Sequence, residues 1–318
     1  MFLESFKITG LAVTQIFLLG AIGYFLVKRN ILGQDGLNSL SRLVIEITLP
    51  ILIFCQLVKD FSFRQYPDWW VFPLISIAIT AVGLLVGLIF TGFIRGAQHR
   101  LQFLSLVTFQ NSGYLPLALV AALLPKDKVD SMFIYIFLFL LGFNIVMWSL
   151  GVYMLSFHQN RRFELGSLFS PPVIATLFSL IFIFLGLHKF VPLLILRPLQ
   201  MVGDCTLPLA MFVVGGNLAE IQLRHTDKKA VFFMTLAKLI ILPLLGLLLI
   251  MKFKLSELMG LLILIELAVP PATSLSVIIR HYEKEDLLIS QGVFFGHIIS
   301  IITIPVFLSL YFMLVMIK

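Results

Sequence analysis

The segment VTFQNSGYLPLALV, residues 107–120, interrupts an apolar run that is long enough to cross a lipid bilayer. Its centre carries Gln110, Asn111, Ser112, Gly113 and Pro116. Proline removes a backbone donor and clashes with the preceding turn, and glycine permits irregular backbone. Irregular backbone at this depth is tolerated only where it is buried in protein or lines a wet cavity. The segment therefore predicts a membrane helix that is interrupted near the bilayer midplane.

The composition indicates an all-α polytopic membrane protein. The chain has 318 residues, of which 60% are hydrophobic and only 12% are charged, and its mean hydropathy is +1.06. A soluble domain needs more polar surface than this. A membrane helix needs about 20 apolar residues. We identify ten such spans: 8–27, 37–58, 69–93, 101–124, 132–155, 171–187, 191–218, 230–251, 255–279 and 287–317.

The net charge of +7 comes largely from short gaps between the apolar runs. This distribution is typical of membrane topology and does not point to a nucleic-acid partner. Arg64 is the one loop arginine on the side of the two termini, and the other loop arginines lie on the opposite side. By the positive-inside rule we expect both termini to lie on the outer side of the membrane. The loop arginines of the predicted cytoplasmic side are Arg29, Arg95, Arg100, Arg161, Arg162, Arg224 and Arg280.

The two halves of the chain repeat a motif. Residues 46–54, EITLPILIF, and residues 204–212, DCTLPLAMF, both read acidic-x-Thr-Leu-Pro-x-x-x-Phe. Further matches at similar offsets are Asp68 with Asp227 and Asn144 with His297. These matches predict a five-plus-five repeat, with residues 1–157 as the first copy and 171–318 as the second. Because five is odd, the second copy enters from the opposite side. Inverted repeats of this kind are typical of secondary transporters.

The counterpart of the opening segment is the ninth span, where LILIELAVPPATSLSVII covers residues 262–279. A double proline interrupts this span as well. Each interruption creates helix ends, and an N-terminal end offers free N–H groups and a partial positive charge to an anion. We therefore predict that the fourth and ninth spans cross at a substrate site. The residues predicted to bind substrate are Asn111, Ser112, Gly113, Pro116, Pro270, Pro271, Thr273 and Ser274.

Ionisable residues within spans are costly in lipid and are expected to face the protein interior. Glu266 is the leading candidate for ion coupling. It carries a proton, or it ligates Na⁺ with oxygens of Gln110, Asn111 and Ser112, or it only bonds a neighbouring helix. Lys238 is expected to counter an anionic substrate or a buried carboxylate such as Glu266 or Asp204.

The other polar residues within spans have two interpretations each. Glu46 and Asp204 line the same cavity or pair with polar groups nearby. His297 bonds a neighbour or shuttles protons. We expect Pro50, Pro208, Pro243 and Pro305 to kink their helices. Cys55 and Cys205 are expected to be buried free thiols.

The sequence contains no motif for enzymatic or metal chemistry. It has no Walker sequence, no G-x-G-x-x-G in a βαβ context, no Cys/His metal spacing and no nucleophile–base arrangement. We therefore predict no catalytic residue, no metal site and no cofactor other than H⁺ or Na⁺ as a coupling ion.

Five stretches carry a resemblance to a known family: TLPILIFCQL, FQNSGYLPLAL, AKLIILPLLGL, VPPATSLSVIIRHY and GVFFGHIISIITIPVF. Together they resemble the auxin efflux carrier family of plant and bacterial PIN-like transporters, which is related to the bile acid:sodium symporters. The resemblance covers residues 11–312. It implies a scaffold domain of spans one, two, six and seven, and a transport domain of spans three to five and eight to ten. Family members carry small organic anions, such as auxin in plants and malate or malonate in some bacteria.

The resemblance transfers to individual positions only in part. The asparagine of the first crossover matches Asn111, and the crossover prolines match Pro116 and the pair Pro270–Pro271. Pro116 comes two positions earlier than in many relatives, and Thr273 and Ser274 stand where many relatives have asparagine. The long central loop of the plant carriers is absent, because residues 156–170 form only a short link. These departures leave the implied fold intact, but the substrate of the relatives does not transfer to this chain.

We therefore expect a secondary transporter that moves a small carboxylate anion by an elevator-like shift of the crossing helices. One alternative is a sodium-coupled symporter of bile-acid-like or other organic anions. Another is a membrane sensor that binds a ligand in the same cavity without transport. The expected partners are the organic anion, the lipid bilayer and a second copy of the chain that joins through the scaffold helices.

Overall fold

A computed structural model describes residues 2–156, 168–221, 223, 227–281 and 287–315. Over these residues the chain is helical, and its one β-type pairing is an isolated bridge. The all-α prediction is therefore confirmed. Most of the link 156–170 lies outside the described residues, as do three of the arginines used for orientation, Arg161, Arg162 and Arg224.

Seven helical segments of the described chain are long and apolar enough to cross a membrane. Several consist of more than one helix, joined without a loop. They are Phe2–Lys28 (α1), Gln34–Asp60 (α2, η1 and α3), Val71–Thr91 (α4), Lys126–Leu155 (α7, η2 and most of α8), Leu193–Ala219 (α10 and α11), Lys228–Phe253 (α12, η5 and α13) and Leu287–Val315 (α16).

The other three predicted spans contain shorter helices. Span 101–124 divides into α5 (Ala97–Thr108) and α6 (Tyr114–Leu123), and span 255–279 divides into α14 (Glu257–Ala268) and α15 (Ser274–His281). Span 171–187 holds α9 (Pro171–Phe184), followed by a short 3₁₀ helix, η4 (Leu187–Phe190). The structure therefore has seven long spans among its described residues, and the ten-span arrangement stays a prediction.

Prolines divide several of the long segments. A π-helical turn, η1 (Val44–Thr48), separates α2 (Gln34–Leu43) from α3 (Leu49–Asp60), whose second residue is Pro50. In the same way η5 (Leu236–Ile241) separates α12 (Lys228–Thr235) from α13 (Leu242–Phe253), whose second residue is Pro243. Because proline cannot donate to the carbonyl four residues earlier, the preceding turn widens.

The remaining boundaries show that proline is neither sufficient nor necessary for such a division. Helix α10 (Leu193–Asp204) ends just before α11 (Thr206–Ala219), which contains Pro208. Helix α16 continues through Pro305. Without any proline, η2 (Met147–Gly151) separates α7 (Lys126–Val146) from α8 (Val152–Ser156).

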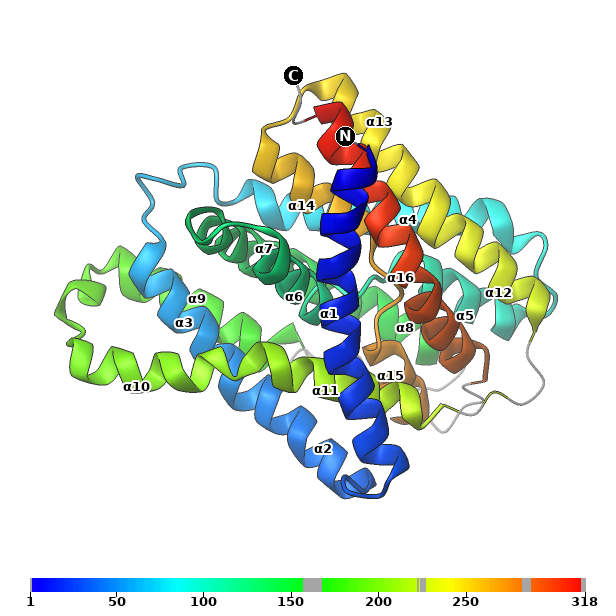
Figure 1. Cartoon of the computed structure of the whole chain (residues 1–318), viewed down its shortest axis with the longest axis horizontal. Coiled ribbons are helices and arrows are strands. Elements are labelled where there is room, and N and C mark those ends of the chain that lie inside the picture. The colour runs from blue at the N-terminus through cyan, green and yellow to red at the C-terminus, as the bar shows by residue number, and fades with distance from the viewer. Residues whose placement is uncertain (1, 157–167, 222, 224–226, 282–286, 316–318) are drawn as a thin grey trace.

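The helices of the described chain pack as one connected body. Helix α1 stands across the molecule in Figure 1 and packs on both α11 and α16, while α3 packs on α9 and α10. Helix α4 packs on α5 and α7, and α16 packs also on α12, α14 and α5. Further contacts join α1 and α11 to α6, and α3 to α7.

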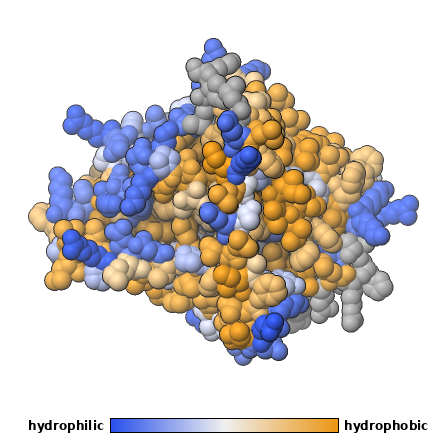
Figure 2. Space-filling model, viewed as in Figure 1, coloured by the Kyte–Doolittle hydropathy of each residue, from blue (hydrophilic) through white to orange (hydrophobic). Residues whose placement is uncertain are grey.

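Apolar side chains cover much of the outer surface, as Figure 2 shows for one face. Leu194 is 84% exposed and Phe190 is 81% exposed. Such surface is unfavourable in water and is typical of contact with lipid or with another protein.

Small residues allow α1 and α11 to approach closely. A Cβ atom built on Gly215 of α11 would lie 1.7 Å from the carbonyl oxygen of Gly20 in α1. Backbone atoms cannot move aside as a flexible side chain would. Close helix contacts of this kind are typical of membrane proteins.

We predict that Gly215→Ala destabilises the protein by on the order of 1–3 kcal/mol, because the added methyl group forces α1 and α11 apart. Thermal unfolding in detergent measures the effect. Gly10→Ala is the matched control, since a Cβ there meets nothing within 4 Å. Equal melting temperatures for the two variants would contradict the close α1–α11 contact.

Candidate functional site

Two extended segments of the chain pair with each other in the interior. One joins α5 to α6 and the other joins α14 to α15. Gln110 and Pro271 form an antiparallel bridge. The Asn111 N–H donates to the Pro270 carbonyl at 2.9 Å, and the Ala272 N–H donates to the Phe109 carbonyl at 3.0 Å. We call residues 109–113 and 269–273 the paired segments.

Four helix ends meet at the paired segments. Helices α5 and α14 end there, and α6 and α15 begin there. The first N–H groups of a helix have no partner within it, so the starts of α6 and α15 present donors and a partial positive charge. The ends of α5 and α14 present carbonyl oxygens. The arrangement therefore offers hydrogen-bond donors to an anion and acceptors to a cation or a proton-bearing group.

The start of α6 accommodates a proline at position 116. Pro116 is the third residue of α6, and the first bond of that helix runs from the Leu117 N–H to the Gly113 carbonyl. A backbone N–H at position 116 would have no partner within the helix, so a proline there, which lacks this N–H, removes no helical hydrogen bond. Gly113 has φ −96°, which other residues also adopt. A Cβ on it would meet nothing within 4 Å, so the backbone borders open space.

Asn111 bonds to helix α16. Its side-chain nitrogen Nδ2 lies 3.3 Å from Nε2 of His297, and Nδ1 of His297 lies 2.8 Å from the Val293 carbonyl. Both side chains are buried. Gly296 of α16 allows the segment 269–273 to pack closely on that helix beside His297, because a Cβ at Gly296 would lie 2.7 Å from Cδ of Pro271.

A second polar cluster surrounds Glu266, which is fully buried near the end of α14. The side chains of Ser112, Lys238 and Gln110 lie around its carboxylate. None of the side-chain oxygens of Glu266, Gln110 and Ser112 reaches hydrogen-bonding geometry with a partner among the described residues, and neither does the Gln110 amide nitrogen. Unsatisfied buried polar groups are costly, so this cluster needs a physical explanation.

Lys238 of η5 is the basic residue near Glu266, and it is 1% exposed. Of the two carboxylates proposed as its partner, the structure brings Glu266 near it. Asp204 instead lies near Cys55 of α3. Cys55 is buried as expected, while Cys205 is exposed.

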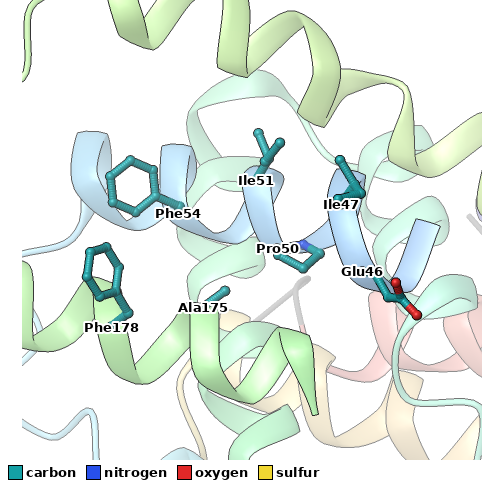
Figure 3. Close-up of a pocket in the computed structure, with 7 residues that line it drawn as sticks. All are labelled: Glu46, Ile47, Pro50, Ile51, Phe54, Ala175 and Phe178. Carbon is teal, nitrogen blue, oxygen red and sulfur yellow. The ribbon is translucent and has the colours of Figure 1, made fainter. Parts of the chain in front are cut away.

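Glu46 and Asp204 lie away from the paired segments. Glu46 is exposed and accepts a hydrogen bond from Nε of Arg42 at 3.1 Å, and Asp204 is exposed at the end of α10. Glu46 borders a cavity of about 260 Å³ between α3 and α9 (Figure 3). Its carboxylate points away from the phenylalanine rings of that cavity. The cavity is lined by Glu46, Ile47, Pro50, Ile51, Phe54, Ala175 and Phe178.

Thr273 and Ser274 lie where α15 begins, and Thr273 is 8% exposed. The Thr273 carbonyl accepts the Ser276 N–H at 3.2 Å. Sequence reasoning missed Gly296, whose lack of a side chain lets Pro271 pack on α16 beside His297. No local pattern signals this contact, because it depends on how the paired segments pack on α16.

Comparison with known proteins defines the class. Residues 10–165 and 156–308 match the profile of a family described as "Membrane transport protein". The chain is therefore an integral membrane protein of the transporter class, whose members are not enzymes. It belongs to the auxin efflux carrier, or PIN-like, family, as the resemblance of its motifs predicted.

Individual proteins with similar sequences are named as transporters or as PIN-LIKES proteins. The chain is 26% identical to an uncharacterised transporter of Methanocaldococcus jannaschii, over 92% of this chain and 95% of the relative. It is 20% identical to the protein PIN-LIKES 1 of Arabidopsis thaliana, over 98% of this chain and 80% of the relative. A shorter match to PIN-LIKES 6 of the same plant is 29% identical and covers 38% of this chain and 29% of that protein.

We predict that cysteines at positions 110 and 271 form a disulfide after Cys55 and Cys205 are replaced by serine. Bridged residues of an antiparallel pair have Cα atoms about 4.5–5.5 Å apart, which is within disulfide range. Mass spectrometry of oxidised protein detects the cross-linked peptide. The control pair, at positions 110 and 278, should stay unlinked. Failure of 110–271 to cross-link under conditions that keep the protein folded would contradict the pairing.

Proposed function

We propose that this protein is a secondary transporter that carries a small organic anion, with a carboxylate group, by elevator-type alternating access. Its ten spans form two inverted repeats of five, and the fourth and ninth spans are interrupted and cross at the anion site. The observation that carries this proposal is the backbone pairing of residues 109–113 with residues 269–273, where four helix ends meet.

The positions of the first and last helices favour an even number of spans. Thr9, near the start of α1, shares a hydrogen bond of 3.0 Å with Ser309, near the end of α16. The start of α1 and the end of α16 also lie at the same end of the molecule in Figure 1. Seven crossings would put them on opposite sides of a membrane. Ten crossings, with the three divided or short segments included, put them on the same side.

Equivalent positions of the two halves have similar local structure, which supports the repeat. The acidic-x-Thr-Leu-Pro motifs both stand where a long helix is divided, before α3 and before α11. Asn144 and His297, matched in the sequence, both bond the carbonyl four residues earlier on their own helix, at 2.8 Å.

The proposed scaffold domain contains α1, α2, α3, α9, α10 and α11, and the proposed transport domain contains the helices from α4 to α8 and from α12 to α16. Within the domains α3 packs on α9 and α10, and α4 packs on α5 and α7. Polar contacts between the domains include the bond from Nε2 of Gln56 in α3 to Oδ1 of Asp130 in α7, at 3.0 Å. A polar contact is readily exchanged for water, as sliding of the transport domain requires.

The anion is held by the N–H groups at the starts of α6 and α15 and by the side chain of Asn111. The open space beside Gly113 gives the ligand access to this backbone. Ser112, Pro116, Thr273 and Ser274 shape the two helix starts.

Glu266 is the coupling group, and the coupling ion is a proton. The ammonium of Lys238 beside it repels a metal cation and favours this assignment. The second candidate is Na⁺ coupling, as in a sodium symporter. The unpartnered oxygens of Glu266, Gln110 and Ser112 favour that candidate.

The arginine distribution favours an orientation with both termini outside. The short link at 156–170, in place of the long loop of the plant carriers, supports a bacterial-type member in an inner membrane. The transporter forms a homodimer through its scaffold helices. The exposed apolar side chains of α10, such as Leu194, support a contact with lipid or with a second copy.

Removing the side-chain amide of Asn111 tests the site. Asn111→Ala should weaken the apparent affinity for the carried anion roughly ten- to hundredfold, since a hydrogen bond to a charged group contributes about 1.5–3 kcal/mol. Uptake of radiolabelled carboxylates, including indole-3-acetate, into proteoliposomes provides the measurement. Asn144→Ala is the control. Unchanged transport by Asn111→Ala would refute the assigned site, and ligand binding without flux would favour a sensor.

Ion gradients across the same proteoliposomes test the coupling. We expect a pH gradient to drive accumulation of the anion, and a sodium gradient at constant pH and ionic strength to have no effect. Glu266→Gln should strongly reduce the driven accumulation and retain exchange of anion for anion, because the amide cannot take up a proton. Accumulation driven by sodium alone would overturn proton coupling and support the symporter.

A further inference from the structure

His297 has a defined tautomer. Its Nδ1 atom faces the carbonyl oxygen of Val293 at 2.8 Å, and a carbonyl oxygen only accepts hydrogen bonds. Nδ1 therefore carries a hydrogen atom. In the neutral ring Nε2 then has a lone pair and no hydrogen.

This tautomer determines the orientation of the Asn111 amide. Nε2 of neutral His297 accepts a hydrogen bond, and the atom that faces it at 3.3 Å is Nδ2 of Asn111. One amide N–H of Asn111 is thus committed to His297. The amide oxygen Oδ1 points away from the ring and is available as an acceptor. In this state Asn111 offers a carboxylate only its second N–H.

Protonation of His297 reverses the arrangement. An imidazolium has a hydrogen on both nitrogens, so Nε2–H would face the NH₂ group of Asn111, and two donors cannot bond each other. Rotation of the amide by half a turn brings Oδ1 to the ring. Both N–H groups of Asn111 then become free for another acceptor.

We propose that His297 is the positioning residue that selects which end of the Asn111 amide meets the ligand, and that a proton taken up at Nε2 of His297 turns the amide N–H groups towards a carboxylate. The inference rests on the proposed role of Asn111 as a ligand contact. It adds a second proton-linked step, distinct from Glu266, in which no covalent bond other than N–H forms. Anion binding is strengthened as pH falls through the titration of His297.

The buried ionisable groups on elements packed against α16 are Glu266 of α14 and Lys238 of η5. When both are ionised their charges are opposite, so they act on His297 in opposite directions. The side chains of Arg280 and His281 on α15 are outside the described residues. The remaining titratable groups on the packed elements lie towards helix ends and are Glu4, Lys7, Tyr24, Lys28, His99, Arg100, Lys228, Lys229, Lys252 and Glu257.

Nuclear magnetic resonance of the full-length protein in detergent tests the inference without any ligand. With ¹⁵N-labelled histidine, the signals of His297 are those lost in His297→Gln. At pH 8 we expect a protonated Nδ1 and an unprotonated Nε2. Asn111→Leu, which has a similar shape and no donor, should move the Nε2 signal towards that of a free nitrogen and leave Nδ1 in place. A proton on Nε2 instead of Nδ1 at pH 8 would overturn the proposal.

The second measurement follows the Asn111 amide itself in ¹⁵N-asparagine-labelled protein. We expect its NH₂ signal to shift with the same midpoint as His297 during a pH titration. The shift should persist in His99→Gln, which removes an exposed histidine, and disappear in His297→Gln. If His297→Gln does not fold, His297→Asn serves instead. An Asn111 signal that stays constant while His297 titrates would refute the switch. A coupled titration together with normal transport by Asn111→Ala would refute the proposed function and leave the switch intact.

Discussion

Two backbone hydrogen bonds hold the centre of this molecule together, from the Asn111 N–H to the Pro270 carbonyl and from the Ala272 N–H to the Phe109 carbonyl. Unpaired backbone groups cost several kcal/mol each in hydrocarbon. A helix that stops in the interior of a membrane protein therefore needs another partner for its backbone. Here each of two extended segments is that partner for the other, and the four helix ends around them depend on this pairing.

The two paired segments differ in composition: one is rich in proline and the other in polar side chains. The segment before α15 contains two prolines in succession, so it has few N–H groups to satisfy and a stiff backbone. The segment before α6 contains Gln110, Asn111 and Ser112, whose side chains reach in two directions. Asn111 contacts His297 on α16, while Gln110 and Ser112 face Glu266 on α14. One short stretch thus connects the proposed anion site with the proposed coupling group, and this proximity gives the two a physical route for communication.

Much of this arrangement follows from the sequence, because proline and glycine act locally. The interruptions at 109–113 and 269–273, the divisions before Pro50 and Pro208, and the family itself could all be predicted from such residues. The proximity of Lys238 to Glu266 rather than Asp204 could not, because it depends on how η5 packs against α14. The exposure of Glu46 and Asp204 could not be predicted either, since their symmetric positions in the sequence say nothing about which face of a helix meets the interior. The start of α6 accommodates Pro116, and sequence patterns locate such a boundary only to within a few residues.

Alternating access at the paired segments requires that the backbone around Gly113 is reached from both sides of the membrane in turn. A cysteine at position 113, in protein whose Cys55 and Cys205 are replaced by serine, tests it in proteoliposomes of known orientation. We expect a membrane-impermeant maleimide to label this cysteine when added on either side, and the carried anion to slow labelling from both sides. Labelling from one side only, under conditions in which the protein transports the anion, would contradict alternating access at this site.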